Sequence, residues 1–76
     1  MNFMQKYSIK GNFIDTCNHK GTVYILTTEY LLRLIPYNET LEILTSNIPT
    51  DAKAIISYNG EILVFTPNGI FVAYGD

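Results

Sequence analysis

Turn signals recur along this chain at short intervals and limit every regular element to a few residues. Asn59-Gly60 lies between two apolar runs, and both central positions of a type I′ hairpin turn require a positive φ, which Asn and Gly adopt readily. Pro67-Asn68-Gly69 is a second turn, because proline presets φ and glycine accepts a left-handed conformation. Further breaks fall at 18–21, 36–38 and 48–51. The segments between the breaks have the length of strands.

The composition favours strands in those segments. Ten Ile, three Val and eight Thr make 21 β-branched residues of 76, against three Ala. Residues 28–35 and 51–58 also contain apolar positions at helical spacing, and periodicity alone leaves helix and strand open there. The predicted strands lie near 3–9, 12–17, 22–28, 30–35, 40–46, 52–58, 61–66 and 69–74.

An internal repeat favours a strand at 51–58. A shift of 39 positions aligns two glycines and two threonines of the turns without a gap and matches 51–58 with 13–17, which has a strand pattern. The aligned identities are Ile9 with Ile48, Gly21 with Gly60 and Thr27 with Thr66. We predict a single small all-β domain over 1–76, with an internal repeat of 2–37 and 41–76.

The repeat resembles the blades of β-propeller proteins. A period near 40 residues with four short strands is typical of such blades, and residues 54–72 resemble the first three strands of one. The first copy runs from Ile14 to Ile35 and adds 40–44 as an outer strand. The resemblance implies that 3–9 completes the second sheet, giving two tandem four-stranded antiparallel β-meanders. Neither a Trp-Asp dipeptide nor a kelch-type double glycine occurs, so no named propeller family is implied.

Several predicted strands are apolar on both faces. The runs are Val23-Tyr24-Ile25-Leu26, Ile62-Leu63-Val64-Phe65 and Ile70-Phe71-Val72-Ala73-Tyr74. Because side chains on a strand point alternately to opposite faces, such runs indicate a sheet covered on both sides. Two blades cannot close a propeller ring, so we expect the remaining faces to be buried against other copies, as in lectins that build one ring from several two-blade chains. A monomeric small β-sandwich or barrel is the alternative fold.

Asp15, Cys17 and His19 alternate along one predicted strand and face the same way. Carboxylate, thiolate and imidazole can act as metal ligands or in nucleophilic catalysis. Residues two apart on a strand are separated by about 6.6 Å, however, which is too far for neighbouring ligands of one ion. The favoured interpretation is a half-buried Cys17 with His19 in a solvated turn, and we predict no catalytic residue, no metal and no cofactor.

The remaining charged residues are interpreted as surface groups. Glu29, Glu39, Glu42 and Glu61 lie in or beside predicted turns or on a strand's polar face, where charges discourage edge-to-edge strand pairing. Arg33 interrupts an apolar strand and could bind an anionic ligand or pair across strands with a glutamate such as Glu42. The cross-strand pair is the favoured interpretation.

Charge and hydropathy limit the classes of partner and the location that we expect. A net charge of −2 with four scattered lysines argues against nucleic acid. The longest apolar run is 70–74, far below the roughly 20 residues of a membrane-spanning helix, and the first residues show no signal-peptide pattern. A single cysteine fits a reducing interior, so a cytoplasmic location is expected. Six Tyr and four Phe are assigned to core packing and subunit contact.

These observations predict a non-catalytic, self-associating β-repeat interaction module, a homo-oligomer that binds a protein partner. A lectin-like, ligand-binding oligomeric propeller is the alternative, for which the sequence identifies no ligand-binding residues. The Asn- and Ile-rich composition is typical of AT-rich genomes, and small proteins of this kind are frequent in phages and prophages, which associates the chain with phage or prophage accessory proteins.

Overall fold

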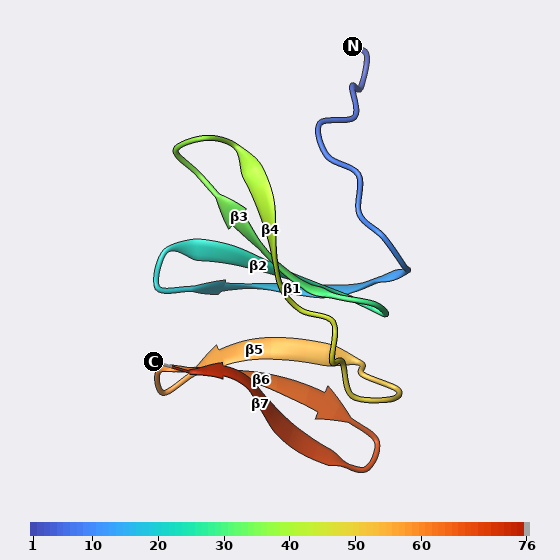
Figure 1. Ribbon diagram of the computed structural model, residues 1–76, viewed down its shortest axis with the longest axis vertical. Coiled ribbons are helices and arrows are strands. Elements are labelled where there is room, and N and C mark those ends of the chain that lie inside the picture. The colour runs from blue at the N-terminus through green and yellow to red at the C-terminus, as the bar shows by residue number, and fades with distance from the viewer. Residues whose placement is uncertain (76) are drawn as a thin grey trace.

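The computed structural model describes residues 1–75, the last two by backbone alone, and it is all-β (Figure 1). Asp76, where the second predicted repeat ends, and the side chain of Tyr74 lie outside the described part. Within residues 1–75 there are seven strands and no helix, so the predicted all-β character is confirmed, including strand at both segments with helical spacing. The strands are β1 (Phe13–His19), β2 (Thr22–Thr27), β3 (Leu31–Ile35), β4 (Thr40–Thr45), β5 (Ala54–Tyr58), β6 (Glu61–Thr66) and β7 (Gly69–Gly75).

The strands form two antiparallel sheets in which each strand pairs with its neighbour in sequence. Sheet 1 has the order β1-β2-β3-β4 and sheet 2 the order β5-β6-β7. The sheets lie one over the other, with β1 next to β5 (Figure 1). The residues after β4 carry the chain from one sheet to the other (Figure 1).

Each sheet starts with a tight hairpin built on the same turn. Lys20 and Gly21 have φ of 53° and 80°, and Asn59 and Gly60 have φ of 52° and 81°. Two consecutive positive φ angles are the mark of a type I′ turn, whose twist matches that of the strands it joins. The hairpin predicted at Asn59-Gly60 is therefore confirmed by the pairing of β5 with β6.

The second turn of each sheet is closed by a threonine hydroxyl. The Oγ1 of Thr27 accepts hydrogen bonds from the backbone N–H groups two and three residues ahead, at 3.1 and 3.0 Å. The Oγ1 of Thr66 accepts the two corresponding bonds, at 3.1 and 3.1 Å. A threonine hydroxyl can accept hydrogen bonds from the backbone N–H groups of a tight turn in this way. The two aligned threonines therefore stabilise equivalent turns in the two sheets.

The hydrophobic core lies between the two inner faces. Sheet 1 contributes Leu26 and Leu31, and sheet 2 contributes Ile55, Ile62 and Val64, all at most 2% exposed. Burial of an aliphatic side chain of this size stabilises the fold by about 1.5–3 kcal/mol. Stacking of the sheets is therefore driven by these aliphatic residues.

The predicted strand at 3–9 is wrong. Residues 1–9 form no strand, and sheet 2 has three strands where four were predicted. Asn12 is tied to Thr28 by two hydrogen bonds of 2.9 Å, and Gly11, with φ of 80°, turns the chain away there. The segment then runs along sheet 1, away from β7, and within residues 1–75 it pairs with no strand (Figure 1).

The molecule is elongated and exposes a large area for its mass. Its extents are 41 × 24 × 22 Å and its radius of gyration is 12.7 Å, against about 11.4 Å for a typical domain of this length. The accessible area is 5344 Å², whereas a compact monomer of this mass exposes about 4,700 Å². The excess reflects the extended N-terminal segment and the outer faces of the sheets.

Candidate functional site

The row of Asp15, Cys17 and His19 on β1 faces sheet 2. One carboxylate oxygen of Asp15, Oδ2, accepts a hydrogen bond of 2.9 Å from the backbone N–H of Ile55 on β5. The other, Oδ1, accepts one of 2.8 Å from the N–H of Thr16. The carboxylate is thus held by two backbone donors and joins the sheets.

His19 is buried, and its predicted place in a solvated turn is wrong. The side chain is 2% exposed, and its Nδ1 lies 2.7 Å from the hydroxyl of Ser57 on β5. Its ring also meets that of Tyr24 edge-on, with centroids 5.7 Å apart and planes at 78°. His19 is the last residue of β1, next to the predicted turn. It is buried because sheet 2 packs over it, and the local sequence does not encode that long-range contact.

Cys17 is half-buried against the core, as predicted. Burial raises the pKa of its thiol, and the negative charge of Asp15 raises it further. A raised pKa keeps the sulfur protonated near neutral pH, and the thiol is a poor nucleophile and metal ligand. The environment of Cys17 is therefore the opposite of the one that activates a catalytic cysteine.

The described residues do not assemble a metal centre. Across 1–75, no three His, Cys, Asp or Glu side chains are grouped so that they could hold one ion. Asp15 and His19 each bond to a different point of β5 instead. The chemistry of this row is that of a polar seam between two sheets.

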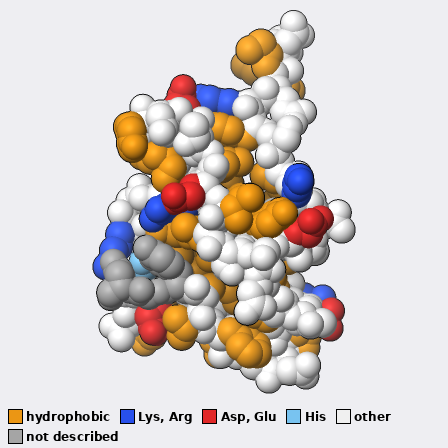
Figure 2. Space-filling view, in the orientation of Figure 1, with side chains coloured by type: hydrophobic (Ala, Val, Ile, Leu, Met, Phe, Trp, Pro, Cys, Tyr) orange, Lys and Arg blue, Asp and Glu red, His pale blue; other side chains and the backbone are white. Residues whose placement is uncertain are grey.

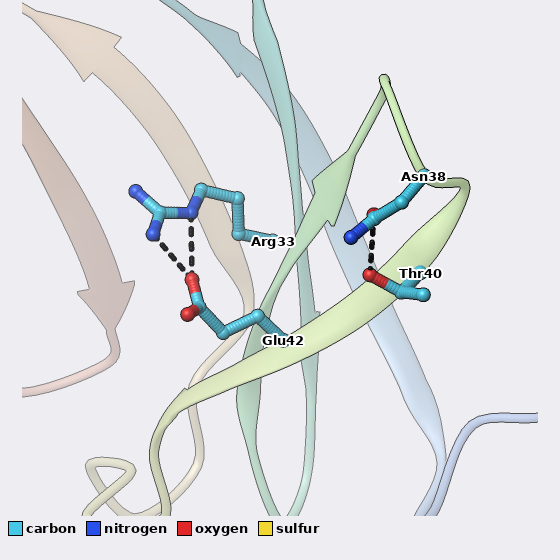
Figure 3. A network of polar contacts seen from close by, with 4 residues as sticks. All are labelled: Arg33, Asn38, Thr40 and Glu42. Atoms are coloured by element: carbon cyan, nitrogen blue, oxygen red, sulfur yellow. Dashed lines mark hydrogen bonds and ion pairs between the residues drawn. The ribbon is translucent and has the colours of Figure 1, made fainter.

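Arg33 pairs with Glu42 across β3 and β4, as predicted (Figure 3). The guanidinium Nε donates to Oε1 of Glu42 at 3.0 Å, and a second nitrogen, Nη2, donates to the same oxygen. The hydrogen bond to Glu42, followed by one to the Tyr24 hydroxyl, raises the pKa of Arg33. Arg33 is therefore paired with a carboxylate of its own chain.

The other carboxylates are separate surface groups. Glu39 pairs with Lys6 of the N-terminal segment at 2.6 Å, and both side chains are more than 60% exposed. Glu29 lies exposed between β2 and β3, and Glu61 lies opposite Tyr58 at the start of β6. Glu39 and Glu42 are each held in an ion pair, and Glu29 and Glu61 lie apart from them. These four glutamates therefore do not provide two carboxyl groups that converge on one site, as acid–base catalysis needs.

The outer face of sheet 2 is apolar and uncovered. Residues paired directly across strands point to the same side, which places on this face Ala54, Ile56, Tyr58, Leu63, Phe65, Ile70 and Val72. Tyr58, Ile70 and Val72 are 64%, 60% and 58% exposed. Glu61 is the one charged side chain on the face within residues 54–73.

The outer face of sheet 1 is also apolar and is partly covered. Ile25, Leu32 and Ile43 form a row across β2, β3 and β4. Residues 8–10 lie beside this row around a hollow of about 230 Å³, so that Leu32 is 5% exposed while Ile43 is 56% exposed. Hydrophobic side chains accordingly appear at the surface over both sheets and along the N-terminal segment (Figure 2).

A larger hollow of about 580 Å³ lies between β7 and the connection that follows β4. Its wall includes Phe71 and Val64 of sheet 2, while the connection contributes Asn47, Pro49 and Thr50. The described residues around it are apolar or neutral polar, with no charged side chain.

Sequence reasoning missed Ser57 and the joining role of Asp15. In the 39-residue register, β5 corresponds to residues 15–19 of β1, the first strand of the other sheet. Ser57 is the one hydroxyl in the otherwise apolar stretch 54–57, which is the signal that a polar partner faces it.

No protein-family model, curated protein or solved structure matches this chain. Within the described part, a search for a helix long and apolar enough to cross a membrane finds none.

Proposed function

We propose that this chain is a non-catalytic, self-associating β module whose two sheets act as blade-like units in an assembly of several copies. The observation that carries the proposal is the outer face of sheet 2, defined above, where Tyr58, Ile70 and Val72 are more than half exposed. Contiguous apolar surface of this kind on a small protein marks an interaction site.

The occupant that fits this face best is a second copy. Within one chain, the inner face of sheet 1 packs on the inner face of sheet 2 through aliphatic residues. The outer faces have the same apolar character, and sheet 1 has an exposed Ile43 on the outer face of its edge strand β4. Packing of sheet 1 of one copy on sheet 2 of the next repeats the contact that already holds the chain together. Such a head-to-tail contact closes into a ring when the rotation permits.

The test is the oligomeric mass of the native chain and of a face variant, by light scattering at micromolar concentration. We expect the native chain to exceed 8.6 kDa and Ile56→Lys, at a 41% exposed site on β5, to lower the mass. The matched control is Tyr37→Lys, at an 88% exposed site in the β3–β4 turn, which should leave the mass unchanged. A native chain of 8.6 kDa favours the monomeric sandwich and overturns the proposal.

The second candidate is a lectin-like ring that binds a small ligand. The hollow of about 580 Å³ favours it, because its wall combines the aromatic ring of Phe71 with threonine hydroxyl and asparagine amide groups. Small-molecule sites typically combine apolar or aromatic walls with a few polar groups. Thermal-shift screening with simple sugars tests it: a sugar that raises the melting temperature, and fails to do so in Phe71→Ala, supports ligand binding.

A further inference from the structure

The outer edge of β7 is an open strand edge. β7 pairs with β6 on one side, and within residues 1–75 no strand pairs with its other side. Its sequence from Gly69 to Ala73 has no charge and no proline, two of the devices that protect natural edges, and the register shift in its ladder with β6 is confined to the Val72–Tyr74 end. The corresponding strand of sheet 1, β3, has its outer edge covered by β4. Sheet 2 therefore carries an edge suited to one more strand.

The N-terminal segment 3–9 has the pattern of a strand without a partner. On an extended chain one side carries Phe3, Gln5, Tyr7 and Ile9, three of them apolar or aromatic, and the other side carries Met4, Lys6 and Ser8. Phe3 is 95% exposed. The polar contacts of the segment include the exposed Lys6–Glu39 pair and short-range hydrogen bonds of Gln5, and exposed contacts of this kind contribute little stability.

We propose that residues 3–9 of a second copy add to the outer edge of β7 as an antiparallel fourth strand of sheet 2. The inference rests on the proposed self-association and names the segment that carries it. The main chain of the incoming strand pairs with β7, and its apolar side faces the 580 Å³ hollow beside Phe71.

The dimensions favour edge pairing in addition to packing of faces. Three strands about 20 Å long and about 4.8 Å apart present about 290 Å² on one face, or about 600 Å² over two copies. Stable interfaces bury about 1,200–2,000 Å² of accessible area. Face packing alone therefore falls well below the lower end of this range, and an added strand supplies further buried area and a row of main-chain hydrogen bonds.

The donor comes from another copy because of where the segment lies. It extends beyond the β3–β4 end of the molecule, while β7 lies at the opposite end of a body 41 Å long (Figure 1). In its own chain the segment runs beside the outer face of sheet 1. A copy that packs sheet 1 on sheet 2 of its neighbour brings this segment toward the neighbour's β7.

The test uses full-length chains with defects in either half of the contact. The donor-defective chain is Phe3→Asp with Tyr7→Asp, and its matched control is Met4→Asp with Ser8→Asp, on the opposite side of the same segment. The acceptor-defective chain is Phe71→Asp, at a 47% exposed site. We expect each defective chain alone to be monomeric, the control to keep the native mass, and an equimolar mixture of the two defective chains to form a one-to-one complex.

The outcomes separate this inference from the proposed function. A donor-defective chain that keeps the native oligomeric mass overturns strand addition and leaves self-association in place. Two monomeric defective chains that do not complement each other also overturn it, because the segment then acts within its own chain. A native chain of 8.6 kDa overturns both. The donor and control substitutions lie outside every strand, so these two variants retain the fold, and circular dichroism checks the same for Phe71→Asp, which lies in β7.

Discussion

Replacement of Asp15 by alanine tests whether the polar seam between the sheets stabilises the fold. The substitution removes the acceptor of the Ile55 N–H and leaves that backbone donor without its 2.9 Å partner. A hydrogen bond to a charged group contributes about 1.5–3 kcal/mol, and partial exposure places Asp15 at the lower end, about 1.5–2 kcal/mol. For a domain of this size, the loss corresponds to a fall in Tm of about 6–16 °C.

The assay is guanidinium unfolding followed by circular dichroism, at one fixed protein concentration because self-association makes stability depend on concentration. The total stability expected for 76 residues is about 4–11 kcal/mol, so the loss is readily measured. Asp15→Asn is the control, since it keeps an oxygen acceptor, and it should cost at most about 1 kcal/mol. A change below about 0.5 kcal/mol for Asp15→Ala would show that the seam does not hold the sheets together.

Four further outcomes are expected. Cys17 should react with iodoacetamide more slowly in the native protein than after unfolding, because burial raises its thiol pKa; equal rates would contradict this. The hydrogen bond from Lys6 lowers the pKa of Glu39, so the pair stabilises the fold above the unfolded-state pKa of Glu39 and is lost as the pH falls; Lys6→Met should raise that pKa toward its ordinary value in a carboxyl NMR titration. Gly60→Ala should destabilise by about 1–2 kcal/mol in urea unfolding, from its φ of 81° alone. Gly11→Ala should cost more, because its Cβ would also lie 2.7 Å from a threonine hydroxyl, and the reverse order would refute the comparison.

Local chemistry made the hairpins predictable. Asn59-Gly60 specifies its turn through two positive φ angles, a property of the residues themselves, and the predicted bounds of β6, 61–66, agree with the structure. The Arg33–Glu42 pair was predictable for a similar reason, since both lie on adjacent strands of one hairpin. In each case the information spans a few residues.

The misjudged features depend on residues far apart in the chain. His19 looks like a turn residue until Ser57, 38 positions away, approaches it. The segment 3–9 has strand propensity, yet propensity does not specify which edge it meets, and Gly11 directs it away from β7 in its own chain. Neither outcome is encoded in the pattern of the segment itself.

The pairing of each strand with its neighbour in sequence has a consequence for folding kinetics. Every ladder in the two sheets joins consecutive strands, so each hairpin nucleates on its own, within roughly 1–10 μs. The bond from Ile55 to Asp15 spans 40 positions, and its formation must close a far larger loop. We therefore expect docking of the two preformed halves to be the slow step. The tight turns at Gly21 and Gly60 should form before the polar seam between the sheets does.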